Sequence, residues 1–395
     1  MTDTAVLAVV LAALAGVVAG RAWSAARRRG ELRDRPGFRS SSHYLEGLHY
    51  LGAGQVDKAI VELSAVAREA PEAVEVLQVL GDLLRESGQM ERALQLRRQV
   101  LDRRDLTRSE RAHALAALGT DYRRSGFLDR AARTFEEVLA LEPANVQALT
   151  GIQTLQEEQR QWKDAYETRA RLAQVRKTDD SVVLAHLQAA MGQDALATGQ
   201  LEAAERAFRA AIALDSRVLP AHLGLADLLA PADPRRAATL LEEAVRADPD
   251  RGYLAFDRLQ ALYTACGQPS RFVELCEELI GRDPRDWRAR LALARALDRE
   301  GRHDEALGLL QRAIEVNPHA LELHLAVWGV LQAAGAPAPA VDAYLRSARD
   351  ALFYRDPHLC TSCRYRADAM LWRCPQCHEW NTFVEERLAQ AAVAR

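Results

Sequence analysis

Apolar residues recur along most of this chain with the spacing of α-helices. Leu77, Leu80 and Leu84 fall on one helical face, and a second apolar face follows at Leu94 and Val100. Polar and charged residues fill the positions between them. The pattern predicts pairs of amphipathic helices that bury their apolar faces against each other and against the neighbouring pairs.

A short motif recurs with these pairs and sets their register. The segment Gly88-Gln-Met-Glu-Arg-Ala93 reappears in modified forms, so that each copy ends at a small or apolar anchor residue. The anchors are Ala59, Ala93, Ala131, Ala165, Ala204, Ala237, Phe272, Ala306 and Ala340. Successive anchors lie 34, 38, 34, 39, 33, 35, 34 and 34 residues apart. A period near 34 in a helix-rich sequence is typical of stacked helix pairs.

Two further positions keep this register. Glycine or alanine stands twelve residues before the anchor, as at Gly81 and Gly192, and proline often stands twelve residues after it, as at Pro143. A small residue allows close helix approach, and proline prevents the second helix from continuing. This small–turn–alanine–proline pattern resembles the tetratricopeptide repeat family and covers about residues 43–350. An ordinary helical bundle, the alternative, would not repeat its glycines and prolines on this schedule.

Some repeats depart from the pattern. The fourth, around Trp162, lacks the glycine turn, and the sixth has Pro231 and Pro234 instead. Extra residues near 105–109 and 177–181 are expected to form loops. In the family that this sequence resembles, the inner face of the array binds peptides or partner domains. Helical register places seven candidate binding residues on that face, although each could equally belong to a charged face that is merely solvated: Gln78, Asp82, Arg85, Arg123, Arg124, Arg288 and Arg295.

The N-terminal segment predicts a membrane anchor. Ala5 to Gly20 is a run without polar side chains, followed by Arg21 and several further arginines. Because positive residues stay on the cytoplasmic side, residues 1–26 should form one transmembrane helix that leaves the repeats in the cytoplasm. A signal peptide and a soluble helix are the alternatives. Residues 27–42 read as a basic juxtamembrane linker. The Gly16–Gly20 spacing could support a homodimer, although such spacings also arise by chance.

Four of the six cysteines lie close together near the C-terminus. Cys360 and Cys363 form one CxxC pair, and Cys374 and Cys377 form the other. Two such pairs can hold one tetrahedral metal ion, zinc or iron, in a closed structural site. Two redox dithiols are the alternative. The expected module, residues 354–384 before a tail at 385–395, resembles rubredoxin and zinc ribbons.

Two features of this module leave its details open. Arg364 and His378 stand where glycine commonly follows the second cysteine of each pair, so the sequence departs from the usual turn of such modules. Trp372 and Trp380 flank the second pair and are expected to form the core of the module.

The net charge and the motif content limit the classes of function that this chain could have. A net charge of −3 gives no electrostatic reason to expect binding to nucleic acid. The sequence has no HExxH motif, no phosphate-binding glycine loop and no nucleophile elbow. We therefore predict a protein that is not an enzyme.

The order of anchor, repeats and four-cysteine module resembles the lipopolysaccharide assembly protein B family along nearly the whole chain. Its most specific part is the segment from Trp372 to Thr382. The resemblance implies an inner-membrane adaptor that regulates lipopolysaccharide synthesis. Its implied partners are the membrane-bound AAA+ protease that degrades the committed lipid A deacetylase, and lipopolysaccharide synthesis proteins. The alternatives are a membrane-tethered scaffold or chaperone for another envelope or secretion complex, and a nucleic-acid regulator, which the weak charge disfavours.

Overall fold

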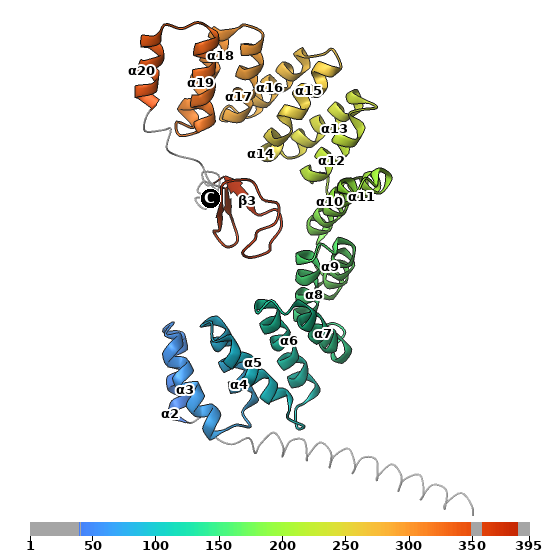
Figure 1. The fold of residues 1–395 in the computed structure, drawn as a ribbon, viewed down its shortest axis with the longest axis vertical. Coiled ribbons are helices and arrows are strands. Elements are labelled where there is room, and N and C mark those ends of the chain that lie inside the picture. The colour runs from blue at the N-terminus through green and yellow to red at the C-terminus, as the bar shows by residue number, and fades with distance from the viewer. Residues whose placement is uncertain (1–38, 40, 349–357, 386–395) are drawn as a thin grey trace, which may run out of the picture. The chain divides into compact units, whose positions relative to one another are not determined.

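The fold is an array of antiparallel helix pairs followed by a small three-stranded sheet (Figure 1). The computed structural model describes residue 39, residues 41–348 and residues 358–385. The all-α repeat architecture with a C-terminal metal-binding module is confirmed. The predicted anchor at residues 1–26 lies outside the described residues, as do most of the predicted linker and tail. Within the described ranges, no helix is both long enough and apolar enough to cross a bilayer.

The chain divides into two compact units, residues 1–151 and 152–395. The described helices of the first unit are α2 (Ser42–Gly52), α3 (Val56–Glu69), α4 (Val74–Glu86), α5 (Met90–Leu101), α6 (Arg108–Arg124) and α7 (Leu128–Leu141). The boundary between the units falls within α8 (Val146–Glu158). Loops join α5 to α6 and α9 to α10 where the longer spacings predicted them, and a capping box of Thr107 and Glu110 begins α6.

The second unit contains the remaining repeats and the sheet. Its helices are α9 (Trp162–Arg176), α10 (Ser181–Ala197), α11 (Leu201–Leu214), α12 (Leu219–Leu229), α13 (Pro234–Ala247), α14 (Pro249–Gly252), the 3-10 turn η2 (Tyr253–Ala255), α15 (Phe256–Ala265), α16 (Ser270–Arg282), α17 (Trp287–Arg299), α18 (His303–Val316), α19 (Leu321–Ala333) and α20 (Ala338–Ala348). The strands are β1 (His358–Cys360), β2 (Arg366–Ala367) and β3 (Phe383–Glu385).

Close helix packing explains the repeated small residues. The anchor residues Ala204 and Ala237 are fully buried, and the side chain four residues after Ala204, Phe208, is buried as well. A Cβ atom added to Gly192 would lie 2.5 Å from the Phe208 ring, and one added to Gly224 would lie 2.3 Å from it. The ring therefore fits between two glycines from successive repeats. In the first unit, Phe135 is held in the same way.

The turn between paired helices requires a left-handed residue, which glycine adopts without steric strain. Gly199 has φ 75° five residues before its anchor Ala204. In the fourth repeat Arg160 occupies the corresponding position before Ala165 and has φ 58°. The turn is thus conserved in shape without its glycine, because the backbone N–H groups of Arg160 and Gln161 still bond to the preceding helix.

Two repeats depart from the common pattern. In the sixth, the Asp233 side chain accepts a bond from the backbone N–H of Arg236 and caps α13, with Pro234 in the first turn. In the last, the anchor Ala340 lies in the first turn of α20 and is exposed. The helix α20 packs through Tyr344 instead, whose hydroxyl lies 2.6 Å from Nδ1 of His324 on α19.

The two glycines around Phe208 give a stability prediction. Replacing Gly224 by alanine should destabilise the second unit by about 1–3 kcal/mol, because overpacking outweighs the gain in helix propensity. Urea denaturation followed by circular dichroism measures the effect. The matched control is Gly308→Ala on α18, where an added Cβ meets nothing within 4 Å. That variant should be as stable as the parent or more so, and a Gly224→Ala protein more stable than the parent would contradict the packing argument.

Candidate metal centre and its seat on the repeats

The four predicted cysteines lie on two hairpin turns of the C-terminal module. The sheet order is β2-β1-β3, and both pairings are antiparallel, with Cys360 of β1 opposite Phe383 of β3. Cys360, Cys374 and Phe383 are fully buried and form the core of the module. Such a core is too small to fold a domain of this size by itself.

The unusual residues after each CxxC pair adopt the conformation that glycine would supply. Arg364 has φ 63° and His378 has φ 61°. The backbone N–H of Arg364 donates to the carbonyl of Cys360 at 2.9 Å, and that of His378 donates to the carbonyl of Cys374 at 3.0 Å. Both turns therefore keep the shape that points two sulfurs at one centre.

The sulfur geometry fits a single metal ion. The four Sγ atoms lie within 4.8 Å of one another. Two of these separations join the two turns, at 3.5 Å between Cys363 and Cys374 and 3.7 Å between Cys360 and Cys377. Zinc–sulfur bonds of about 2.3 Å at tetrahedral angles place sulfurs about 3.8 Å apart. The cross-turn spacing favours one shared centre over two separate dithiols, and zinc and iron both suit it.

The environment of the thiols also favours a cation. Burial opposes ionisation of Cys360, but the Thr382 hydroxyl and nearby backbone N–H groups lower its pKa to about 6. The Thr382 hydroxyl lies 3.2 Å from its sulfur. Burial raises the pKa of Cys377 to about 12. Burial thus opposes ionisation of Cys377 in the protein alone, and a bound metal ion would offset that cost by compensating the charge of the thiolates.

The module is seated on the repeats through a buried ion pair. Glu157 of α8 is 4% exposed, and its carboxylate lies 2.6 Å from the Arg373 guanidinium of the module. The indole N–H of Trp380 and the amide of Gln153 also donate to this carboxylate, at 3.3 and 2.9 Å. The carboxylate thus accepts two hydrogen bonds and faces one guanidinium group, so both partners compensate a charge that would otherwise be costly to bury.

An aromatic contact extends this interface. The ring of His186 on α10 lies 5.6 Å from the Trp380 ring and 5.8 Å from the Trp372 ring, and Trp380 meets Trp162 of α9 edge to face. The expectation that the two tryptophans form the core of the module is therefore wrong, because they pack against the repeat helices.

A second set of contacts lies on α14 and η2. The hydroxyl of Tyr253 is 3.4 Å from Nε2 of His358, and the Arg251 guanidinium lies 3.5 Å from two carbonyl oxygens near β3. Sequence reasoning missed all of the repeat residues in this interface. In the sequence, the two tryptophans beside Cys374 and Cys377 were the feature that could have indicated this interface.

His186 makes the seat sensitive to acid. Burial lowers the pKa of its imidazole to about 4, so the docked form is neutral at pH 7. When the pH falls below 6.5, the ordinary pKa of an imidazole, His186 becomes protonated where it is exposed but stays neutral where it is buried. Stability should therefore fall between about pH 6.5 and pH 4. Denaturation midpoints at several pH values measure this, and His186→Phe should remove part of the decline. Parallel curves for both proteins would contradict it.

Three of the predicted partner-binding residues of the first unit, Gln78, Asp82 and Arg85, contact a network of ion pairs. Asp82 lies 2.6 Å from the buried guanidinium of Arg97, and Arg85 lies 3.2 Å from buried Asp121. Burial raises the pKa of Asp121, although Arg97 and Arg85 oppose that rise. The carbonyl of Gln78 accepts a bond from Arg97. Asp82 and Arg85 therefore have a structural role, and their role in partner binding stays a prediction.

The other predicted residues are placed differently. Arg123 is half-buried and Arg124 is exposed, both at the end of α6. In the second unit, the Arg288 guanidinium stacks on the Tyr253 ring at 3.6 Å, and Arg288 and Arg295 line a cavity of about 340 Å³. Tyr253 also contacts the metal-binding module, so this cavity borders the seat of the module.

Family comparisons agree with both parts of the chain. Residues 358–385 match a family model described as a rubredoxin metal binding domain. Models described as tetratricopeptide repeats match residues 44–107, 116–168, 189–232 and 267–334. Fold and site thus define a tetratricopeptide repeat protein with a C-terminal rubredoxin-type metal-binding module.

Relatives of the whole chain are more specific. Lipopolysaccharide assembly protein B of Escherichia coli strain K12 is 24% identical over 374 residues, which cover 93% of this chain and 95% of that protein. The protein of the same name from Haemophilus influenzae is 23% identical over 379 residues with the same coverage. The chain is a homologue of the lipopolysaccharide assembly proteins B, and the predicted resemblance is confirmed.

Solved structures resemble the chain more distantly. MamA is 17% identical, covering 42% of this chain and 91% of that one, with a TM-score of 0.31. A tetratricopeptide repeat protein from Parabacteroides merdae is 14% identical, covering 73% of this chain and 97% of that one, with a TM-score of 0.28.

Proposed function

We propose that this protein is a membrane-anchored adaptor that regulates lipopolysaccharide synthesis. The observation that carries the proposal is the homology with lipopolysaccharide assembly proteins B over 93% of the chain, repeats and metal-binding module included. The apolar run from Ala5 to Gly20 supports the anchor, and the arginines that follow it support a cytoplasmic position of the repeats.

The chemistry of the described residues supports an adaptor that is not an enzyme. In those parts of the chain, the four cysteines are the one group of three or more side chains whose ligand atoms could share a metal ion. A metal bound there supplies a structural cross-link. The four sulfurs fill a tetrahedral shell, and the two turns that carry them leave no position for a substrate.

An adaptor of this kind acts by holding its partners together. Following the family resemblance, we propose that the partners are the membrane-bound AAA+ protease, its deacetylase substrate and lipopolysaccharide synthesis proteins. Tethering to the same membrane raises the effective concentration of such partners without any catalytic group. The exposed arginines Arg124 and Arg295 are the candidate contacts on the repeats, since neither forms an ion pair with another residue that the structure describes.

Depletion of the protein in cells tests this function. We expect the committed deacetylase to accumulate and lipopolysaccharide to rise, because the protease loses its adaptor. Re-expression of the full chain should restore both levels, whereas re-expression without residues 1–26 should not. Unchanged deacetylase and lipopolysaccharide would exclude this role and favour the alternative, a tethered scaffold for another envelope complex. Co-purification from solubilised membranes would then identify the partners.

A further inference from the structure

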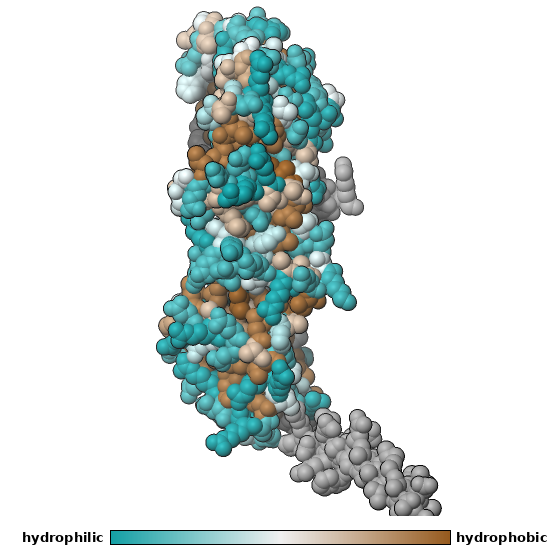
Figure 2. Space-filling view, turned by 90° about the vertical axis from the view of Figure 1, so that its right-hand side faces the viewer, coloured by the Kyte–Doolittle hydropathy of each residue, from teal (hydrophilic) through white to brown (hydrophobic). Residues whose placement is uncertain are grey.

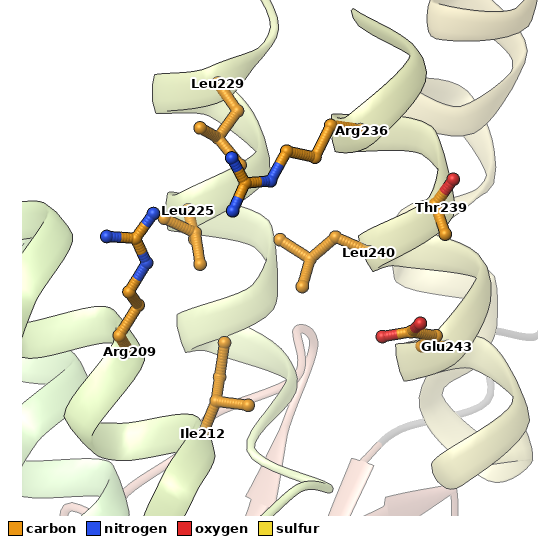
Figure 3. Close-up of a pocket in the computed structure, with 8 residues that line it drawn as sticks. All are labelled: Arg209, Ile212, Leu225, Leu229, Arg236, Thr239, Leu240 and Glu243. Atoms are coloured by element: carbon orange, nitrogen blue, oxygen red, sulfur yellow. The ribbon is translucent and has the colours of Figure 1, made fainter. Parts of the chain in front are cut away.

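A groove on the second unit lies apart from the metal-binding module. It is formed by α11, α12 and α13 and encloses about 400 Å³ (Figure 3). Its floor is aliphatic, with Ile212, Leu225, Leu229 and Leu240. Figure 2 faces the side on which α11 and α13 lie in Figure 1, and apolar patches bordered by hydrophilic residues are visible there. None of the module contacts described above involves a residue of this groove.

The charges around the groove are distributed unevenly. The guanidinium groups of Arg209 and Arg236 extend over Leu225 and Leu229 from opposite walls, whereas Glu243 lies at the other end (Figure 3). Among the described residues, Arg236 has no ion-pair partner. Arg209 pairs with Glu205 at 2.6 Å, but its side chain is half exposed, so water weakens the pair. Two cations thus stand at one end of an apolar surface.

The position of Arg236 is unfavourable for its own helix. It lies in the first turn of α13, beside Arg235, and that turn contains no acidic residue. Positive side chains there are repelled by the partial positive charge of the helix N-terminus. The capping carboxylate of Asp233 offsets part of this repulsion. It accepts from the backbone N–H of Arg236, however, so the guanidinium group of Arg236 is still available to a bound carboxylate.

We propose that this groove binds an amphipathic segment of a partner protein, with aliphatic side chains beside a glutamate or aspartate. A groove of this volume holds a few aliphatic side chains. The acidic group of the segment would lie between Arg209 and Arg236, because guanidinium groups bind carboxylates in a bidentate manner. Glu243 would repel that group at the opposite end and so fix the direction of the segment.

The same charges argue against a lipid surface as the occupant. Attraction to anionic membranes requires clusters of several basic residues. Here two arginines share the groove with Glu243, and Glu205 and Asp233 stand close to them in the sequence. The proposal does not depend on a role in lipopolysaccharide synthesis.

Binding of synthetic peptides to the purified full chain tests the groove. The probe is a fluorescein-labelled helical peptide with leucine at positions i, i+3, i+4 and i+7 and glutamate beside the leucines. Two matched peptides carry glutamine or lysine in place of each glutamate. We expect saturable binding of the glutamate peptide by fluorescence anisotropy, and about tenfold weaker binding of the glutamine peptide.

Three protein variants make the test specific. The double variant Arg209→Glu with Arg236→Glu should bind the glutamate peptide at least about tenfold more weakly and should now bind the lysine peptide. Thr239→Trp should block every peptide by filling the groove. The matched control is Arg206→Glu, also on α11 but outside the groove, with a side chain that is 73% exposed. It should bind like the parent.

Several results would overturn the proposal. One is equal binding of the glutamate and glutamine peptides, and another is parental affinity in the double variant or in Thr239→Trp. Vesicles of phosphatidylglycerol provide the last comparison. If they bind the parent through Arg209 and Arg236 while no peptide binds, the groove is a lipid site.

Discussion

Replacing Cys374 by serine is expected to release the metal ion and unfold residues 358–385 while the helices remain folded. Cys374 is fully buried, and its sulfur lies 3.5 Å from that of Cys363. Metal binding contributes on the order of 10–16 kcal/mol to the folding of comparable zinc peptides. The core of the module, three buried residues, cannot replace that contribution.

Elemental analysis, limited proteolysis and circular dichroism together measure this result. The parent should carry one metal ion per chain and a protected module. Cys374→Ser should lose the metal ion and be cleaved within residues 358–385, with little change in helical signal. The control is Cys266→Ser, a half-buried cysteine at the end of α15 that does not belong to the metal site. A metal-free Cys374→Ser protein with a protease-resistant module would refute the structural role of the metal.

Replacing Glu157 by glutamine should release the module from the repeats while the module stays folded and keeps its metal ion. The Glu157 carboxylate is the buried anion for Arg373. Removing one member of such a pair leaves the other without compensation and costs about 3–5 kcal/mol. We expect faster hydrogen exchange in α10 and in residues 372–381, and a red-shifted tryptophan emission.

A double-mutant cycle distinguishes the loss of the Glu157–Arg373 ion pair from a general loss of stability. Glu157→Gln combined with Arg373→Met removes both charges, and it should recover part of the protection because no unpaired ion remains. Glu158→Gln, at the next and exposed position, controls for the loss of one charge on α8. Parental exchange rates in Glu157→Gln would show that the ion pair does not hold the module in place.

The helix pairs and the clustering of the four cysteines were predictable from the sequence, because both depend on residues close together in the chain. The turns of successive repeats use the same types of residue. Two CxxC pairs separated by a short spacer can bring their four sulfurs together without help from the rest of the chain. Local geometry also explains why Arg160, Arg364 and His378 could replace glycine, although the sequence alone left those turns open.

Contacts between distant residues were not predictable in the same way. Glu157 and Trp380 are 223 residues apart, so their contact depends on the path of every intervening repeat. Arg97 shows a second limit. Arg97 stands four residues after the anchor of its repeat. Phe208 and Leu310 occupy the same position in other repeats and are buried, whereas an arginine in the sequence suggests an exposed position. Asp82 and Asp121 provide the compensating charges, and both come from other helices.

The seat of the metal-binding module changes how the second unit should unfold. In a linear repeat array each hairpin depends on its immediate neighbours, and melting can begin anywhere and spread step by step. Here residues near the C-terminus bond to α8, α10 and α14, so helices separated along the array share one set of contacts. The hairpins between them should therefore melt in a single concerted transition, and a chain stripped of its metal ion should melt in stages.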